Sequence, residues 1–218
     1  MAAAGAAVAA GLAAGSGASD GQAARRLDHI RLTASGTGPP ALVVIDMQNV
    51  FGAPSSGWFT PKFAEASAVI ERMLPAFGDR VISTRFVAPA HPEGAWVTYY
   101  QEWPFALVPD TDPIYDLVAP FRESGHPTVT ETTFGKWGPG LQRALGDSAE
   151  MVLTGVATDC CVLSTALAAA DAGVRVSVVA DGCAGSTDAN HQRALDAMAL
   201  YGPLIEITDS AGVLERVR

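Results

Sequence analysis

The sequence has little charge, few cysteines and almost no lysine. Only 17% of its 218 residues are Asp, Glu, Lys or Arg, whereas 49% are hydrophobic, which allows a core large enough for one globular domain. The formal net charge is -9, and no basic cluster exists beyond the pair Arg25 and Arg26. The sequence therefore lacks the positive surface with which proteins bind nucleic acid, and we expect no such partner.

Three cysteines, two of them adjacent, do not form the even, spaced framework of a small disulfide-rich secreted protein. We therefore expect a reducing, cytoplasmic location. Lysine occurs only at Lys62 and Lys136. This scarcity limits any function that needs a lysine side chain to two candidates.

A long apolar run is also missing. Residues 1–24 are mostly Ala and Gly, but glycines interrupt them and no basic residue precedes them, so they resemble neither a membrane span nor a signal peptide. We predict that residues 1–38 are a poorly ordered or loosely helical Ala/Gly-rich extension and linker, and that residues 39–218 form one domain. We expect no contact with a membrane.

From residue 41 onward, short apolar runs alternate with segments of helical spacing. The predicted strands are 41–45, 81–83, 128–130, 151–154, 174–180 and 204–207, and the predicted helices are 63–74, 140–145, 160–172, 188–201 and 210–217. This alternation predicts a doubly wound α/β fold, with a mostly parallel sheet and helices on both of its faces. The functional crevice of such a fold lies at the carboxyl ends of the strands.

The run from Thr154 to Val162 places a thiol where a helix follows a buried strand. Cys161 is predicted in the first helical turn, where unpaired N–H groups and the helix dipole favour the reactive thiolate. Cys160 points about 100° away on a helix, so we expect the two thiols not to share a pocket and Cys160 to be structural. The alternative for Cys161 is that of most free cysteines, a small buried hydrophobe.

Asp46 follows the apolar run 41–45, which is a costly place for a carboxylate unless it is paired or used. It could accept hydrogen bonds from the turn 47–49. Close to a thiol, it could instead take the thiol proton and return it to a leaving amine.

Two motifs together resemble the isochorismatase-like cysteine hydrolase superfamily. The first is Asp46-Met47-Gln48-Asn49 after the first strand, and the second is Gly155-Val156-Ala157-Thr158-Asp159-Cys160-Cys161-Val162 after the fourth. The resemblance extends over residues 41–208. Either motif alone is a weak signal, but the pair matches in type, order and spacing.

The resemblance implies a three-layer, mostly parallel isochorismatase-like hydrolase fold over residues 39–218. It also implies an Asp, Lys and Cys triad, here with Asp46 and Cys161, that cleaves carbon–nitrogen bonds of amide-like small molecules through a covalent acyl-enzyme. A cis peptide bond between Val156 and Ala157, and an oxyanion hole made by the N–H groups of Ala157 and Cys161, are further implications. Because such proteins are commonly oligomers, we expect a homo-oligomer.

The lysine is where the resemblance is least close. Family members usually carry it near the position of Thr130 or Glu131, whereas the only lysine in this region is Lys136. Lys136 either reaches the crevice from a shifted position or is an exposed loop residue. Glu131 beside Cys161 would raise the pKa of the thiol and would argue against a cysteine hydrolase.

The sequence gives little support for a metal or another cofactor. The four histidines are scattered, and the Asp-x-His pattern with which nicotinamidases of this superfamily hold a metal is missing after Asp46, where Val50, Phe51 and Gly52 stand. We expect no metal site. This difference counts against nicotinamidase itself.

The connection 86–109 is rich in aromatic residues, which favours a functional loop over disorder. Aromatic residues could wall a pocket for a flat or apolar substrate, or they could cover the sheet or fill a subunit interface. The candidates are Phe51, Trp96, Tyr100 and Trp137, together with Tyr99 and Trp103. Arg85 could bind a substrate carboxylate or form a structural ion pair.

The leading hypothesis is a hydrolase in which Cys161 attacks an amide-like carbonyl, Asp46 moves the proton and Lys136 supports the thiolate. Vinyl-ether hydrolysis of isochorismate is an alternative that Cys161 disfavours, because the members with that activity lack the nucleophilic cysteine. The other alternative is a catalytically impaired binding or scaffold protein that keeps the fold.

Overall fold

The computed structural model describes residues 36–217, and six parallel strands form one sheet within them. The predicted extension lies outside the described residues, apart from its last three. The order β3-β2-β1-β4-β5-β6 places β1 and β4 at the centre, and all five strand pairs are parallel. The strands are β1 (Ala41–Ile45), β2 (Val81–Phe86), β3 (Thr128–Glu131), β4 (Glu150–Val156), β5 (Arg175–Ala184) and β6 (Ile205–Thr208). The predicted parallel α/β sheet is confirmed.

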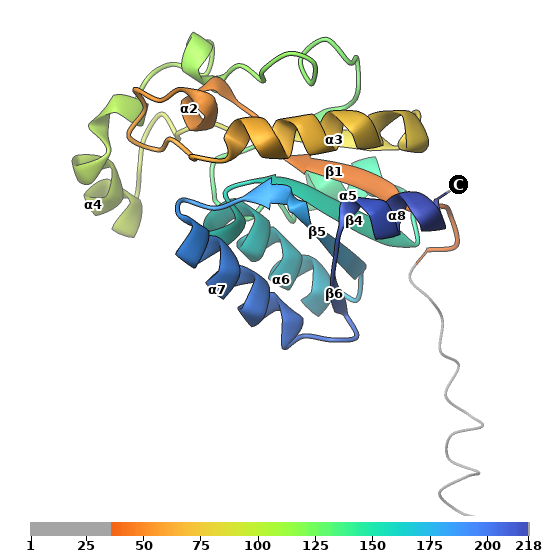
Figure 1. Cartoon of the computed structure of the whole chain (residues 1–218). Coiled ribbons are helices and arrows are strands. Elements are labelled where there is room, and N and C mark those ends of the chain that lie inside the picture. Colours follow the sequence, from red (N-terminus) through yellow and green to blue (C-terminus); the bar gives the residue numbers. More distant parts are fainter. Residues whose placement is uncertain (1–35, 218) are drawn as a thin grey trace, which may run out of the picture. The chain divides into compact units, whose positions relative to one another are not determined.

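Helices cover both faces of the sheet, which gives three layers (Figure 1). They are α2 (Asn49–Gly52), α3 (Phe63–Phe77), α4 (Ala95–Glu102), α5 (Pro139–Leu145), α6 (Leu163–Asp171), α7 (Asp188–Ala199) and α8 (Ser210–Arg216). Short η1 (Pro104–Ala106), η2 (Pro113–Tyr115) and the π-helical turn η3 (Thr158–Val162) complete the elements. Helices α3 and α8 pack on one face, and α5, α6 and α7 pack on the other.

The apolar run of β1 is explained by this double cover. Leu42 and Val44 belong to the core beneath α3, whereas Val43 and Ile45 belong to the core beneath α6. All five residues of β1 are buried, because successive side chains of a strand point to opposite faces and both faces are covered. A continuous apolar strand is therefore what this position in the sheet requires.

The connection after β2 is more regular than the sequence indicated. It contains α4 and η1, although its Trp and Tyr residues have modest helix propensity. Gly94, with φ 57, precedes α4, and the helix buries Tyr100 against the core. Aromatic packing thus outweighs the local preference of this segment.

The order of the strands also fixes where a site can form. The chain turns from β1 toward β2 on one side of the sheet and later returns to β4 on the other side of β1. The carboxyl ends of β1 and β4 therefore flank the point where strand order reverses. Among residues 36–217, no helix is long and apolar enough to cross a membrane.

Candidate active site

Asp46 lies directly after β1, with a backbone φ of 49°. Its backbone N–H donates to Thr84 Oγ1 at 3.1 Å, and the Thr84 hydroxyl donates to Asp46 Oδ1 at 2.6 Å. The neighbouring strand approaches closely, because a Cβ on Gly155 would lie 2.1 Å from the carbonyl oxygen of Ile45. Glycine at position 155, where φ is 105°, is what lets the two chain segments meet here.

Gln48 fixes the turn that follows Asp46. Its side-chain amide donates to the carbonyl oxygens of Phe86 and Tyr115 at 2.8 and 2.7 Å, and its Oε1 accepts from the Phe86 N–H at 2.8 Å. The side chain is fully buried. A buried amide with all three bonds made holds the ends of β1 and β2 in one arrangement.

Lys136 reaches Asp46 from the loop after β3. The distance from its Nζ to Asp46 Oδ2 is 3.1 Å, and both side chains are 0% exposed. Nζ also donates to the Thr133 carbonyl at 2.7 Å and lies 5.0 Å from the centre of the Phe86 ring. The structure therefore places Lys136 in the crevice from a shifted position, rather than on an exposed loop.

A hydrogen-bonded path connects this lysine to the cysteine turn. The backbone N–H of Lys136 donates to Thr165 Oγ1 at 2.9 Å, and that hydroxyl donates to the carbonyl of Cys161 at 2.6 Å. Thr165 lies in α6 and is fully buried. The Thr165 side chain on α6 thus links the turn of Cys161 to the loop that carries Lys136.

Glu131 points elsewhere. Its Oε1 lies toward Gly138 and Gly140 at the start of α5, and the residue lines a separate hollow that includes Arg143. Glu131 is not among the groups whose charge acts on the Cys161 thiol. Of the two residues considered for the place beside Cys161, Lys136 is the one whose charge acts on the thiol.

Cys161 lies in the π-helical turn η3, ahead of α6, and is only 3% exposed. Burial raises the pKa of its thiol well above the usual value, and the Asp46 carboxylate raises it further, by its charge and as an acceptor for the thiol proton. Lys136 acts in the opposite direction. This direction is opposite to the lowered thiol pKa expected from the sequence, because burial and Asp46 act more strongly on the thiol than Lys136 does.

Asp46 is the carboxylate that acts on the Cys161 thiol, and its Oδ2 is the oxygen that Thr84 does not occupy. It is buried and lacks a hydrogen-bond partner among residues 36–217, since Lys136 Nζ lies at ion-pair distance without hydrogen-bond alignment. Oδ1 is already occupied by Thr84. One carboxylate oxygen therefore accepts from Thr84, and the other pairs with Lys136 without accepting a hydrogen bond among residues 36–217.

Ala157 and Cys161 flank the same turn, and the peptide bond between Val156 and Ala157 is cis, as the resemblance implied. The carbonyl of Ala157 accepts from the N–H groups of Cys160 and Val162, each at 3.1 Å. Both Ala157 and Cys161 line one cavity. An oxyanion hole formed by their N–H groups stays a prediction.

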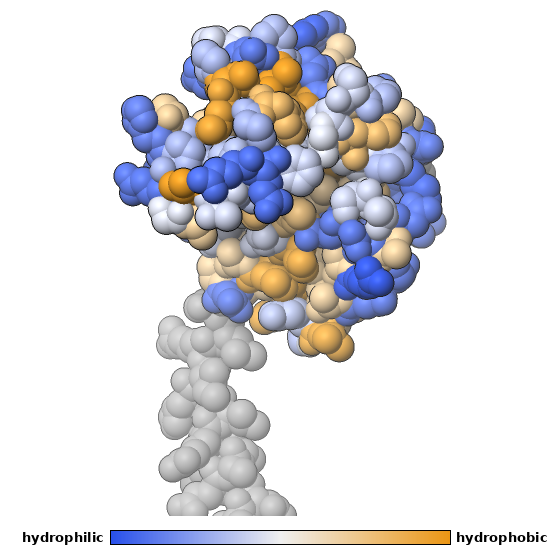
Figure 2. Space-filling model, turned by 90° about the vertical axis from the view of Figure 1, so that its left-hand side faces the viewer, coloured by the Kyte–Doolittle hydropathy of each residue, from blue (hydrophilic) through white to orange (hydrophobic). Residues whose placement is uncertain are grey.

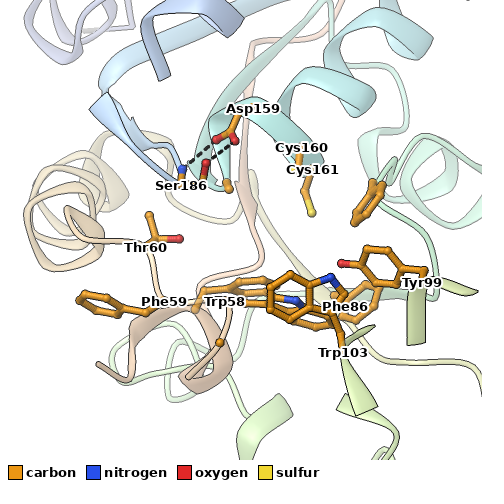
Figure 3. Close-up of a pocket in the computed structure, with 14 residues that line it drawn as sticks. Trp58, Phe59, Thr60, Phe86, Tyr99, Trp103, Asp159, Cys160, Cys161 and Ser186 are labelled. Atoms are coloured by element: carbon orange, nitrogen blue, oxygen red, sulfur yellow. Dashed lines mark hydrogen bonds between the residues drawn. The ribbon is translucent and has the colours of Figure 1, made fainter. Parts of the chain in front are cut away.

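The cavity above this turn has a volume of about 380 Å³, which is enough for a small organic molecule. Figure 3 shows aromatic rings opposite the cysteine turn. The lining residues are Phe51, Gly57, Trp58, Phe59, Thr60, Phe86, Tyr99, Trp103, Phe134, Ala157, Asp159, Cys160, Cys161 and Ser186. Cys160 thus lines the cavity beside Cys161, contrary to expectation, because η3 is a π-helical turn and not an α-helix.

Three of the four residues singled out as pocket lining lie outside this cavity. Phe51 lines it, but Trp96 packs behind Tyr99 and Phe134, with ring centres 5.3 and 5.2 Å away. Tyr100 is 2% exposed and belongs to the core. Trp137 lines a separate hollow beside α5 and Gly36. Tyr99 and Trp103, the other two aromatic candidates, do line the cavity.

Trp58 was not predicted from the sequence, although it is the centre of the aromatic wall. Its ring lies 5.1 to 6.2 Å from five other rings, namely those of Phe51, Phe86, Tyr99, Trp103 and Phe105. It lies in a Gly- and Ser-containing segment without periodicity. Only the aromatic residue type itself could have indicated its place.

Asp159 and Ser186 form the polar side of the cavity and were also not predicted. Asp159 Oδ1 accepts from the Ser186 N–H at 2.8 Å, and Oδ2 accepts from the Ser186 hydroxyl at 2.6 Å (Figure 3). Nearby, Thr158 Oγ1 lies 2.9 Å from His191 Nδ1. Burial lowers the pKa of His191, and the charge of Lys62 lowers it further.

Arg85 lies outside the cavity, with its guanidinium 3.4 Å from the carbonyl oxygen of Asp110. Within residues 36–217, no group of three His, Cys, Asp or Glu side chains is arranged to hold a metal ion.

Viewed from the side that carries α2, α4 and α7, the surface is hydrophilic with separate apolar areas (Figure 2).

A family model, a curated protein and several solved structures match this chain. The model of the isochorismatase domain matches residues 40–211. A curated relative, isochorismatase domain-containing protein 2 of Xenopus laevis, is 35% identical over 88 residues, which are 39% of this chain and 42% of that protein. The match thus spans less than half of the relative's length.

Solved structures share the fold. A cysteine hydrolase from Pseudomonas syringae pv. phaseolicola superposes with a TM-score of 0.72 at 20% identity, covering 85% of this chain and 98% of the other. A nicotinamidase/pyrazinamidase from Bacillus subtilis gives a TM-score of 0.65 at 20% identity, covering 79% and 100%. Because the family model matches residues 40–211, the chain belongs to the isochorismatase domain family.

Proposed function

We propose that this chain is a cysteine hydrolase that cleaves the carbon–nitrogen bond of a small amide through a covalent acyl-enzyme. The observation that carries the proposal is the buried Asp46–Lys136 pair, 3.1 Å apart, beside the Cys161 thiol at the wall of a cavity. A buried ion pair costs desolvation energy that a structural role does not require. The position of the ion pair beside a nucleophile therefore favours a catalytic role.

In the first half of the reaction, the Cys161 thiol gives its proton to Asp46 Oδ2 as the sulfur attacks the amide carbonyl carbon. The carbonyl oxygen gains the negative charge, which the N–H groups of Ala157 and Cys161 stabilise. The carbon–nitrogen bond then breaks, and Asp46 returns the proton to the departing nitrogen. The products of this step are a free amine or ammonia and a thioester on Cys161.

In the second half, water attacks the thioester and gives a proton to Asp46. The bond between carbon and sulfur breaks, the proton returns to the sulfur, and a carboxylic acid leaves. Lys136 holds the carboxylate in place by its ion pair and offsets the charge that develops on the sulfur. Because burial raises the pKa of the thiol, proton transfer accompanies the attack and does not precede it.

The choice of an amide rests on the leaving group and on the related proteins. Asp46 gives the departing nitrogen the proton that it took from the sulfur. Its Oδ2, which accepts no hydrogen bond among residues 36–217, supports this role. Two of the similar solved structures are named a cysteine hydrolase and a nicotinamidase/pyrazinamidase. Both names fit hydrolysis of an amide, although the cavity here has its own lining.

Release of ammonia or amine from a panel of small amides tests the proposal, with variants of the two adjacent cysteines as a matched pair. Cys161→Ala should lower kcat by about a thousandfold or more, whereas Cys160→Ala should keep kcat within about fivefold. Both variants remove one sulfur from the same cavity wall. Equal activity of Cys161→Ala and the wild type would exclude the proposed nucleophile.

A second candidate is a binding protein without turnover, and the raised pKa of the buried thiol is the observation that favours it. Mass spectrometry after mixing with an activated ester of a small acid separates the two. A hydrolase gains the acyl mass on Cys161 in a rapid-quench experiment and then loses it. A binding protein gains no such mass.

We also keep the proposal of a homo-oligomer. Exposed apolar side chains support it, among them Val97, Phe105 and Leu107 near α4 and Leu200 and Leu204 after α7. Sedimentation velocity at micromolar concentration tests it, and a single species with the mass of one chain would contradict it.

A further inference from the structure

The cavity beside Cys161 combines aromatic walls with a single kind of charge. Seven of the fourteen residues that line it are Phe, Tyr or Trp, and the only ionisable carboxylate is that of Asp159. None of these fourteen residues is Lys, Arg or His. A substrate group that enters the cavity therefore meets aromatic rings, neutral hydroxyl and thiol groups, and one carboxylate.

The charge of Asp159 is not neutralised by an ion pair within residues 36–217. Its two oxygens accept hydrogen bonds from Ser186, which fix the carboxylate but leave its charge in place. Lys62 pairs instead with Asp188 at 2.8 Å, and burial lowers the pKa of His191, on which the Asp159 charge acts in the opposite direction. Burial raises the pKa of the Cys160 thiol on the cavity wall, and the charge of Asp159 raises it further.

Lys136 does not change this balance at the cavity surface. It is 0% exposed, and it lies against the Phe86 ring and pairs with Asp46. It is absent from the residues that line the cavity. The charge of Lys136 is thus balanced by Asp46 inside the protein, whereas the carboxylate of Asp159 lines the cavity and acts on a bound molecule.

The aromatic wall favours a cation for an independent reason. The rings of Trp58, Trp103 and Tyr99 lie at tilted angles to one another, with the Trp58 centre 6.2 Å from Trp103 and 6.1 Å from Tyr99. Tilted rings present negative faces in more than one direction, which is the arrangement that attracts a weakly hydrated cation. A carboxylate in the same place would be repelled by the ring faces and by Asp159.

We propose that the amide substrate carries a cationic group, such as a substituted ammonium, that lies against the Trp58 and Trp103 wall with Asp159 as its counter-charge. This rests on the proposed hydrolase function and adds the class of substrate. The net charge of -9 on the whole chain favours the approach of such a molecule.

Binding of matched amides to Cys161→Ala protein tests the proposal without turnover, with tryptophan fluorescence or calorimetry as the readout. Betaine amide carries a trimethylammonium group, 3,3-dimethylbutanamide is its neutral isostere, and succinamate carries a carboxylate. We expect betaine amide to bind about tenfold more tightly than the isostere, and succinamate to bind more weakly than either. Equal or tighter binding of the neutral isostere, or tightest binding of succinamate, would overturn the proposal.

The chain offers a matched control for Asp159. Asp181 accepts from the N–H and hydroxyl of Ser210 at 2.8 and 2.6 Å, the same two distances as the Asp159 pair, but it lies outside the cavity. Asp159→Asn can keep both bonds to Ser186 and should reduce the tenfold preference to about threefold or less. Asp181→Asn should leave the preference unchanged, and equal losses in the two variants would overturn the assignment to Asp159.

Ammonia release by the wild-type protein separates this proposal from the hydrolase itself. A preference for betaine amide in Cys161→Ala, without ammonia from any amide in the wild type, would refute the hydrolase and leave the cation site intact. Faster hydrolysis of the neutral isostere, with no binding preference, would support the hydrolase and refute the cation site.

Discussion

The two lysines of this chain form ion pairs of similar length in opposite surroundings. Lys62 Nζ lies 2.8 Å from Asp188 Oδ1, with side chains 59% and 75% exposed, whereas Lys136 Nζ lies 3.1 Å from Asp46 Oδ2, with both side chains 0% exposed. Water and salt screen the first pair, so its contribution to stability is small. Because the second pair has a similar length but is buried, we expect the loss of one of its partners to lower the free energy of unfolding much more.

The two pairs also hold different parts of the cavity. Lys62 follows the segment with Trp58, Phe59 and Thr60 and ties it to the start of α7. Lys136 joins the loop after β3 to the end of β1, where its Nζ also donates to the Thr133 carbonyl while Thr84 donates to Asp46. The exposed pair supports a wall, whereas the buried pair supports the proposed chemistry.

Replacing each lysine in turn tests whether burial decides the contribution of the two ion pairs to stability. Lys136→Met should lower the free energy of unfolding by about 3 to 5 kcal/mol, because it leaves the Asp46 charge buried without a partner. Lys62→Met should change it by about 0.5 kcal/mol or less. Urea denaturation at pH 7 measures both, and equal small losses would contradict the role given to burial.

Removing both charges of the buried pair tests the same point from the other side. Asp46→Asn combined with Lys136→Met should recover about 2 kcal/mol of the stability lost in Lys136→Met, since no unpaired charge remains. Turnover should stay absent, because the proton acceptor is gone. A double variant as unstable as the sum of the single losses would show that the pair is needed for packing alone.

Local sequence was sufficient to locate the strands and two of the three proposed catalytic residues. The β1 run 41–45 is apolar because both faces of the sheet are covered, Asp46 follows β1 directly, and Cys161 lies in the turn η3 after β4. Lys136 could not be decided in this way. Its place depends on Thr165 in α6 and on Asp46, which is 90 residues away in the chain.

The cavity wall was harder to predict, because it depends on the local conformation of irregular segments. Tyr99 and Tyr100 are adjacent, but α4 turns one toward the cavity and the other into the core, and no pattern in 86–109 revealed that helix. Cys160 reaches the cavity because η3 is wider than an α-helix. The pKa of Cys161 depends on burial and on the charges of Asp46 and Lys136. The sequence around Cys161 does not contain these residues and therefore does not predict the shift.

The thiol responds to the buried pair, which gives a pH test of smaller expected effect. In a Cys160→Ala background, iodoacetamide should label Cys161 only above the ordinary cysteine range, because burial and then Asp46 raise its pKa. Asp46→Asn should shift the labelling curve to lower pH, whereas Lys136→Met should shift it to higher pH. Lys62→Met should leave the curve in place, and an equal shift in all three variants would indicate partial unfolding.

The smallest expected effect belongs to the exposed pair and concerns salt. Lys62→Ala should raise the KM of any amide by about threefold or less, since a screened surface pair contributes little to holding the segment with Trp58. The difference from the wild type should vanish near 1 M NaCl, where the screening length is about 3 Å. Asp188→Asn should behave alike, because it removes the other half of the same pair. A large, salt-independent rise in KM would mean that this pair fixes the cavity wall as firmly as Lys136 fixes Asp46.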